Sequence, residues 1–291
     1  MSKLKDTFAK YLELTKPKVT LLNLFVGVTC FLLAAYPTIN WLNLIAFSLV
    51  GYLAAGGCGV LNSVYDRDID KLMSRTSKRA IPAGYITTKK ALSFGTALIG
   101  VSFTCSYVFF NPLTFLMLAL GLIFYLAIYT VWLKRASPWN VVVGGFAGCF
   151  AGFAGWAAAI GTLSLTAFLI GALDFLWTPG HLWGLAIKKM KEYKSAGIPM
   201  LPVKVGLSKA ALVVFLLNGV TVAFSFLFPL LRLTGTVYLG FAIFAGAGFL
   251  LQNRGLLFSA SEINGFKAFI ASMPYLTLLM LGLILDKIFL I

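Results

Sequence analysis

The chain has 291 residues, of which 60% are hydrophobic and 11% are charged, and its mean hydropathy is +0.92. A soluble domain of this length could not bury so much apolar surface, so the composition excludes an ordinary soluble protein and favours an integral membrane protein. The net charge of +15 would suggest nucleic-acid binding in a soluble protein. In a membrane protein we expect a lipid bilayer as the surroundings and no nucleic acid as a partner.

The N-terminal segment, residues 1–18, alternates basic and apolar residues and has no long apolar run or small-residue cleavage site. It is therefore predicted to be an amphipathic helix that lies on the membrane surface, and not a secretory signal.

Apolar windows of about 19 residues predict an all-α membrane protein with nine transmembrane helices and a single domain over residues 1–291. The predicted spans are 19–36, 41–63, 90–110, 113–133, 139–160, 163–187, 209–231, 235–252 and 266–286.

The basic residues lie almost entirely on one side of this predicted array. With the N-terminus placed in the cytoplasm, only Arg232 and Lys287 of the 24 Lys and Arg residues fall outside the cytoplasmic segments. This asymmetry predicts a multi-pass protein of the cell membrane with its N-terminus inside and its C-terminus outside. The long cytoplasmic loops, about 64–89 and 188–208, carry more charge than orientation requires.

These two loops also resemble one another. IPAGYITTKKA begins at Ile81 and LPVKVGLSKA begins at Leu201. Each has a proline, a glycine, a Thr or Ser suited to cap a helix, and then Lys-Ala at the start of the next span. The similarity is a weak indication of a four-helix internal repeat.

The stretch NSVYDRDID, residues 62–70, follows directly on the second predicted span and holds three of the nine acidic residues. Asn62, Asp66 and Asp70 are spaced i, i+4, i+8 and so share one helix face. Carboxylates are disfavoured at a helix C-terminus and next to like charges. A Mg²⁺ ion held by Asp66 and Asp70 would relieve both problems. The alternative is a solvated, salt-bridged helix end, with Arg67, Lys71 and Arg75 as partners. Asp68 points to another face, where Arg67 or a nearby lysine is its expected partner.

Two further clusters favour a phosphate-binding site. Arg67, Lys71, Arg75, Lys78 and Arg79 form a dense cationic patch next to the aspartates, which suits a metal-bridged phosphate. A second acid, Glu192, follows the sixth predicted span among Lys188, Lys189, Lys191 and Lys194. Together the clusters predict a diphosphate held through Mg²⁺ between two helix ends, with an apolar tail among the spans.

His181 is the only histidine and follows Pro179 and Gly180, which are expected to bend or unwind the sixth span. It is either a polar residue hydrogen-bonded within the bundle or part of a pocket for a large flat molecule. Trp177 and Trp183 are expected to pack within the bundle or to lie at the membrane interface. Asp174 lies deep in the same span, where an acid is costly and usually functional, but its role is not assigned.

These residues resemble the UbiA superfamily of intramembrane prenyltransferases, and within it the branch that acts on heme. The acid motif NxxxDxxxD matches Asn62, Asp66 and Asp70. The heme branch is marked by an RTxxRPLPAG-like stretch, matched from Arg75 to Gly84 with Ala80-Ile81 in place of Pro-Leu. An LTKPRV-like stretch is matched at 14–19 and a WTPxHFWxLA…DYxxAGIPMLPV-like stretch at 177–203. Glu192 replaces the usual aspartate of the second acid motif.

The resemblance implies a UbiA-type bundle that transfers a farnesyl or longer prenyl group from a prenyl diphosphate to a vinyl group of heme b. With addition of water, the products would be heme O and diphosphate. It implies Mg²⁺ as cofactor, with Asp66, Asp70 and Glu192 as ligands and Asn62 as a further catalytic residue. It places the patch cations, Lys191 and His181 at the substrates. Heme A synthase or a terminal oxidase are candidate partners.

Three alternatives stay open on the sequence. A quinone precursor or a lipid could be the prenyl acceptor, although the 177–203 stretch argues against this. A membrane transporter would also have intramembrane acids and broken helices. A heme-binding subunit without catalytic activity would normally use paired histidines.

Overall fold

The computed structural model describes residues 2–289, and throughout this range the secondary structure is helical with no strand. The long elements are α2 (Pro17–Ala35), α3 (Trp41–Tyr65), α5 (Thr88–Phe109), α6 (Pro112–Leu122) with the π-helix η1 (Ile123–Leu133), α8 (Asn140–Ile160), α9 (Leu165–Lys188), α12 (Leu207–Ser225), α14 (Thr236–Phe258) and α15 (Glu262–Phe289). The short ones are α1 (Ser2–Leu14), α4 (Arg67–Leu72), α7 (Lys134–Ala136), α10 (Met190–Ser195), α11 (Leu201–Val205) and α13 (Leu227–Leu230).

Eight helical segments among the described residues are long and apolar enough to cross a membrane, which makes the chain a multi-pass membrane protein. They coincide with eight of the nine predicted spans. The ninth, α9, has 24 residues but is not one of the eight. It carries Asp174 and His181, and both lower its mean hydropathy.

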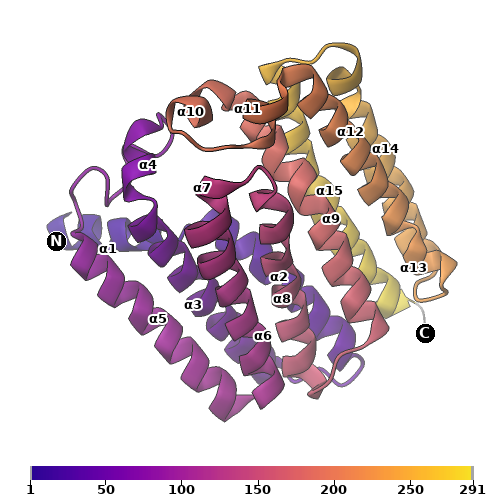
Figure 1. Ribbon diagram of the computed structural model, residues 1–291. Coiled ribbons are helices and arrows are strands. Elements are labelled where there is room, and N and C mark those ends of the chain that lie inside the picture. The colour runs from indigo at the N-terminus through magenta and orange to yellow at the C-terminus, as the bar shows by residue number, and fades with distance from the viewer. Residues whose placement is uncertain (1, 290–291) are drawn as a thin grey trace.

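Four helices form a closed inner ring, because α2 packs on α8, α8 on α9, α9 on α15, and α15 on α2. Small residues allow the close approach between α2 and α8: a Cβ at Gly155 would lie 1.9 Å from the carbonyl oxygen of Gly27. The main buried core extends from this ring to α12 and α14. Figure 1 shows the N-terminal helices on one side of the bundle and α12 and α14 on the other.

The two halves of the chain pack in a corresponding order. In the first half α2 contacts α3, α3 contacts α5, and α5 contacts α6, while in the second half α8 contacts α9, α9 contacts α12, and α12 contacts α14. The short helix α4 follows α3, and α10 and α11 follow α9, at the same end of the bundle (Figure 1). This is the arrangement that a four-helix repeat would produce.

The predicted helix caps differ between the two similar loops. Thr87 caps α5, accepting a hydrogen bond from the backbone N–H of Lys90 at 3.4 Å. In the second loop Gly206, at φ 83°, occupies the cap position of α12, and Ser208 lies inside the helix. The prediction of a Thr or Ser cap is therefore confirmed in the first loop and wrong in the second.

Helix α9 continues without interruption through Pro179 and Gly180, so the predicted unwinding does not occur. Thr178 donates to the carbonyl oxygen of Asp174 at 2.8 Å within this segment. Gly180 instead allows α12 to approach, because a Cβ there would lie 2.0 Å from Oδ1 of Asn218. The neighbouring helices thus hold this proline-containing segment in helical form.

Candidate active site

Helix α3 ends at Tyr65, and Asp66 lies at the break between α3 and α4 with φ −83° and ψ 5°. The backbone N–H of Asp66 still bonds to the carbonyl of Asn62 at 2.9 Å, and that of Asp70 to the carbonyl of Asp66 at 2.8 Å. This near-helical path keeps the three side chains together. Asn62, Asp66 and Asp70 are 5%, 3% and 5% exposed, so the alternative of a solvated helix end is wrong.

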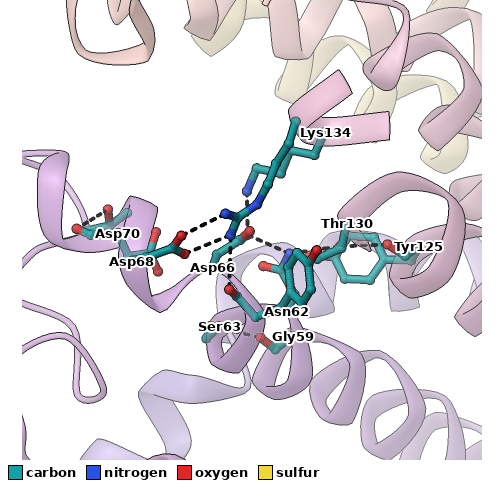
Figure 2. A network of polar contacts seen from close by, with 12 residues as sticks. Gly59, Asn62, Ser63, Asp66, Asp68, Asp70, Tyr125, Thr130 and Lys134 are labelled. Carbon is teal, nitrogen blue, oxygen red and sulfur yellow. Dashed lines mark hydrogen bonds and ion pairs between the residues drawn. The ribbon is translucent and has the colours of Figure 1, made fainter. Parts of the chain in front are cut away.

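Asp66 is the centre of a polar network that Figure 2 shows between α3 and the end of η1. Its Oδ2 accepts from the amide of Asn62 at 2.8 Å and from the ammonium group of Lys134. The amide of Asn62 also donates to Oγ1 of Thr130 at 3.0 Å. Thr130 in turn donates to the carbonyl of Tyr125, five residues earlier, at 2.7 Å. Both residues lie in the π-helix η1, and π-helical turns are frequent at functional sites.

Asp70 is held by the loop that follows α4. Its Oδ2 pairs with Nη1 of Arg79 at 3.1 Å, and its carbonyl accepts from the hydroxyl of buried Thr76 at 3.0 Å. Both partners belong to the RTxxR stretch. The predicted link between that stretch and the aspartates is therefore present as direct contacts.

Lys16 joins the network from the break between α1 and α2. It adopts a left-handed backbone conformation, φ 51°, and its ammonium group donates to Oδ1 of Asn62. Burial, together with the nearby cations Arg79 and Lys134, lowers the pKa of Lys16 from 10.5 to about 7. A cluster of three cations and two aspartates is thus drawn into one buried region.

Asp68 has a different environment from its two neighbours. Its side chain is 60% exposed and forms a bidentate pair with Arg135, with distances of 2.7 and 2.8 Å. These hydrogen bonds lower the pKa of Asp68 to about 2. The expected partners, Arg67 or a nearby lysine, are wrong: Arg67 instead donates to the carbonyl of Val64 at 3.0 Å.

The aspartate pair fits a divalent cation. Oδ1 of Asp66 is buried and has no hydrogen-bond partner among the described residues, although burying an unpaired carboxylate oxygen is costly. Within the same part of the chain, no group of three or more Asp, Glu, His or Cys side chains is placed to hold a metal ion. A donor set of two carboxylates completed by phosphate oxygens and water is the kind that Mg²⁺ accepts.

Glu192 joins the loops that follow α4 and α9 instead of lying against Asp66 and Asp70. Its carboxylate accepts from the backbone N–H and the hydroxyl of Ser74, at 3.0 and 2.9 Å, and pairs with Lys189 at 2.6 Å. These contacts lower the pKa of Glu192, with the Lys189 hydrogen bond as the largest cause. The helix breaks at Lys189, so Glu192 does not continue the face of α9 that holds His181.

Four of the remaining predicted cations form no salt bridge within the described residues, whereas Lys188 does. Lys71, Arg75, Lys78 and Lys191 are exposed, and none of them forms an ion pair in residues 2–289. Lys188 lies 3.9 Å from Glu262 at the start of α15. Exposed cations without an ion-pair partner are available to a phosphate group.

His181 lies within the bundle, sandwiched between aromatic rings. Its ring centroid is 4.2 Å from that of Trp177 and 4.5 Å from that of Phe269. Its Nδ1 is hydrogen-bonded to the hydroxyl of Ser272 at 2.6 Å. Trp177 also donates to the carbonyl of Ser272 at 2.8 Å, and both Trp177 and Trp183 are buried. The tryptophans therefore pack in the core, as favoured from the sequence.

Sequence reasoning missed the residues that reach the acids from other helices, namely Lys16, Thr130, Lys134 and, at Glu192, Ser74. A signal existed for Lys16, because it belongs to the LTKPKV stretch that marks the resemblance. No such signal marks Lys134 or Thr130. A cation at the end of a span, such as Lys134, is expected for membrane orientation alone.

The fold and this site define a multi-pass helical membrane protein with a buried acid pair, flanked by cations, at one end of its bundle. The model of the UbiA prenyltransferase family matches residues 22–278. The chain therefore belongs to the UbiA prenyltransferase family.

Similar sequences are named for one activity. The chain is 37% identical over 284 residues to protoheme IX farnesyltransferase 1 of Cenarchaeum symbiosum, covering 96% of this chain and 95% of that protein. It is 40% identical over 281 residues to protoheme IX farnesyltransferase of Nostoc sp., covering 96% and 88%.

Solved structures share the fold. A structure of digeranylgeranylglyceryl phosphate synthase superposes with a TM-score of 0.79 at 20% identity, covering 97% of this chain and 99% of that one. A UbiA homolog from Archaeoglobus fulgidus bound to DMAPP and Mg²⁺ gives a TM-score of 0.70 at 18% identity, covering 94% and 99%.

Proposed function

We propose that this protein transfers a farnesyl, or longer prenyl, group from a prenyl diphosphate to a vinyl group of heme b, with hydration, to give heme O and diphosphate. The observation that carries the proposal is the buried Asp66–Asp70 pair beside the cations of the RTxxR stretch. The heme acceptor follows from the curated relatives, which match over nearly the whole chain and are named protoheme IX farnesyltransferase.

Asp66 and Asp70 would hold Mg²⁺, and Oδ1 of Asp66, which has no hydrogen-bond partner among the described residues, would be one of its ligands. A bound Mg²⁺ would act as a Lewis acid and stabilise the negative charge of the departing diphosphate. Asn62 fixes the carboxylate of Asp66 through its 2.8 Å hydrogen bond. Glu192 would reach the metal only if its bonds to Ser74 and Lys189 opened.

The cations of the site would bind and orient the diphosphate. Arg79 and Lys134 already contact the aspartates, so they lie within reach of a phosphate bridged to the same metal. The other predicted substrate-binding cations would complete this electrostatic pocket: Arg67, Lys71, Arg75, Lys78 and Lys191. Their positive charge would stabilise the negative charge that develops on the departing diphosphate.

The allylic cation left by the diphosphate needs a dry site lined with aromatic rings. Tyr125 and Tyr129 stack at a centroid distance of 5.9 Å on η1, and Tyr125 is linked to Asn62 through Thr130 (Figure 2). Each ring face would stabilise a cation by about 0.5–2 kcal/mol. The vinyl group of heme would then attack the prenyl cation, and water would add to the resulting carbocation and release a proton.

His181 is the proposed residue on the heme side. Because Nδ1 is engaged by Ser272, any contact with heme would use Nε2. Trp177 and Phe269 fix the orientation of the imidazole ring by stacking on both of its faces. Such a fixed ring is suited to holding a substrate in one orientation.

We also propose the complete topology. Helix α9 packs against α8, α12 and α15 and its 24 residues suffice to cross a bilayer, so it would be the ninth span. The basic residues would place the N-terminus and the active site on the cytoplasmic side of the cell membrane. Helix α1 would lie in the interface. An interaction with heme A synthase or a terminal oxidase stays a prediction.

The experiment that tests the function uses purified protein in detergent with heme b, farnesyl diphosphate and Mg²⁺. Mass spectrometry of the extracted heme should show the mass of one farnesyl group plus one water, and EDTA should abolish the product. Unmodified heme with both farnesyl and geranylgeranyl diphosphate would contradict the heme acceptor. It would leave a quinone precursor or a lipid as the acceptor, whereas failure to bind any prenyl diphosphate would favour a transporter.

A further inference from the structure

A large apolar groove lies outside the inner ring, between α14 and α15. It has a volume of about 680 Å³ and is lined by residues of both helices, including Phe244, Gly248, Leu251, Pro274 and Leu278. Phe244 is 71% exposed and Leu251 is 62% exposed. Both helices are membrane-spanning candidates, so this groove faces the hydrocarbon of the bilayer.

Glycines open the groove. A Cβ placed at Gly240 or Gly248 would meet no atom within 4 Å, so the space above these residues is left empty by the absence of a side chain. Pro274 contributes an exposed ring from α15 on the other side. Two residues without a side chain on α14 and a short proline ring on α15 therefore form part of the groove wall.

A second, polar pocket of about 370 Å³ continues from the end of this groove, and the two share Leu251 and Gln252. Arg254 and Lys267 line it from α14 and α15. Both are exposed, and neither forms an ion pair or side-chain hydrogen bond within the part of the chain that the structure describes.

The turn that carries this polar pocket is cross-linked by hydrogen bonds of one side chain. The amide of Asn264 donates to the carbonyl oxygens of Gly255 and Ser259, at 3.1 and 2.7 Å. A Lys188–Glu262 pair at 3.9 Å joins the start of α15 to the end of α9, at the same end of the bundle as α10 and α11 (Figure 1). The two cations are thus carried on an ordered support at the predicted cytoplasmic interface.

We propose that the α14–α15 groove is a binding site for one anionic phospholipid, with an acyl chain in the apolar part and the phosphate headgroup between Arg254 and Lys267. The occupant follows from the shape and the charge. An amphiphile is required to fill an apolar groove that ends in a polar pocket, and two unpaired cations at the membrane surface select a negative headgroup. The site is separate from the acid pair and does not depend on the proposed prenyl transfer.

The headgroup is tested by native mass spectrometry of the protein in a neutral detergent, titrated with dioleoyl phosphatidylglycerol or with dioleoyl phosphatidylcholine. Wild type should bind one phosphatidylglycerol more tightly than phosphatidylcholine. The double variant Arg254→Gln, Lys267→Gln should bind phosphatidylglycerol about tenfold less tightly. Lys287→Gln removes one exposed cation at the opposite end of α15 and should leave the affinity unchanged.

The acyl chain is tested with Gly248→Leu, whose Cβ would meet no atom within 4 Å and whose side chain would occupy groove space, and which should weaken phosphatidylglycerol binding by at least about tenfold. The matched control is Gly100→Leu, because Gly100 is exposed on α5 and also has no atom within 4 Å of an added Cβ. Its affinity should equal that of wild type.

The proposal would be overturned if wild type bound the two lipids equally. It would also be overturned if phosphatidylglycerol affinity were unchanged in both the Arg254→Gln, Lys267→Gln double variant and Gly248→Leu. Size-exclusion chromatography with light scattering distinguishes the other occupant of such a groove, a second copy of the chain. If Gly248→Leu converts a dimer to a monomer while lipid affinity stays constant, the groove is a protein interface and the lipid assignment is wrong.

Discussion

Asp66, Asp68 and Asp70 lie within one short stretch, yet the structure gives them different chemistry. Asp66 and Asp70 are buried at 3% and 5% exposure, with cations on one oxygen each, whereas Asp68 points outward to Arg135. Burial matters here because a metal–carboxylate interaction strengthens as water is excluded, while an exposed ion pair contributes only about 0–1 kcal/mol.

This contrast predicts the effect of single amide substitutions. Asp66→Asn or Asp70→Asn should lower turnover by at least about 100-fold, because each removes a negative charge from the proposed metal site. Asp68→Asn should keep turnover within a few-fold of wild type, since it loses only an exposed pair. Product heme is measured by mass, and folding is checked by the thermal midpoint in detergent. Wild-type turnover in Asp66→Asn would refute the metal assignment.

Lys16 provides a pH-dependent measurement. Its pKa is lowered from 10.5 to about 7 by burial and by nearby cations. Between these two pH values the unfolded chain keeps the proton that the folded protein has lost, so stability should rise with pH. The thermal midpoint of wild type, compared with that of Lys16→Met, should therefore increase from pH 7 towards pH 10. Parallel pH profiles for the two proteins would contradict a lowered pKa.

At the scale of elements, η1 and α9 each differ from the helix that their sequence predicts, and each does so where it contacts another helix. The π-helix η1 places Thr130 against Asn62, and α9 keeps its helical form at Pro179 with Gly180 against α12. The amide of Asn218 also donates to Oδ1 of Asn253 at 2.8 Å, which continues the polar contact from α12 to α14.

Gly180→Ala should destabilise the protein by about 1–3 kcal/mol, because its Cβ would lie 2.0 Å from Oδ1 of Asn218 and the packed helices resist displacement. Gly219→Ala is the control on α12, since a Cβ there meets no atom within 4 Å. It should be neutral or stabilising by up to about 1 kcal/mol. Thermal unfolding is the measurement. Combining Gly180→Ala with Asn218→Ala should cost less than the sum of the two, and additive losses would show that this contact is not the cause.

For the whole molecule, two polar loops from equivalent places in the halves meet through Ser74 and Glu192, which are 118 residues apart in sequence. The closed ring of α2, α8, α9 and α15 brings the halves together and leaves the groove between α14 and α15 on the outside. The active site and the proposed lipid site are consequently different surfaces of one bundle.

The proposed topology predicts the activity of reporter fusions in a bacterial host. Alkaline phosphatase, which is active only outside the cytoplasm, should be active when fused after Leu163 and inactive when fused after Gly197, because α9 would cross the membrane between them. A fusion after residue 291 should also be active. Equal activity at Leu163 and Gly197 would show that α9 does not span.

The sequence by itself determined the class, eight of the spans and the family. Apolar length, charge asymmetry and short motifs are local properties, and the bilayer imposes the helical solution because backbone groups in hydrocarbon must bond within the segment. The proximity of the acid motif to the RTxxR stretch could also be predicted, because Asp70 and Arg79 are close in sequence.

Only the tertiary structure decided which distant groups complete the site. Lys16 and Lys134 reach Asn62 and Asp66 from other helices, and Arg135 takes the place expected for Arg67 at Asp68. No periodicity encodes such meetings, because they depend on how helices pack and how far each side chain reaches. The groove between α14 and α15 is of the same kind: its glycines are visible in the sequence, but the empty space above them exists only once both helices are in place.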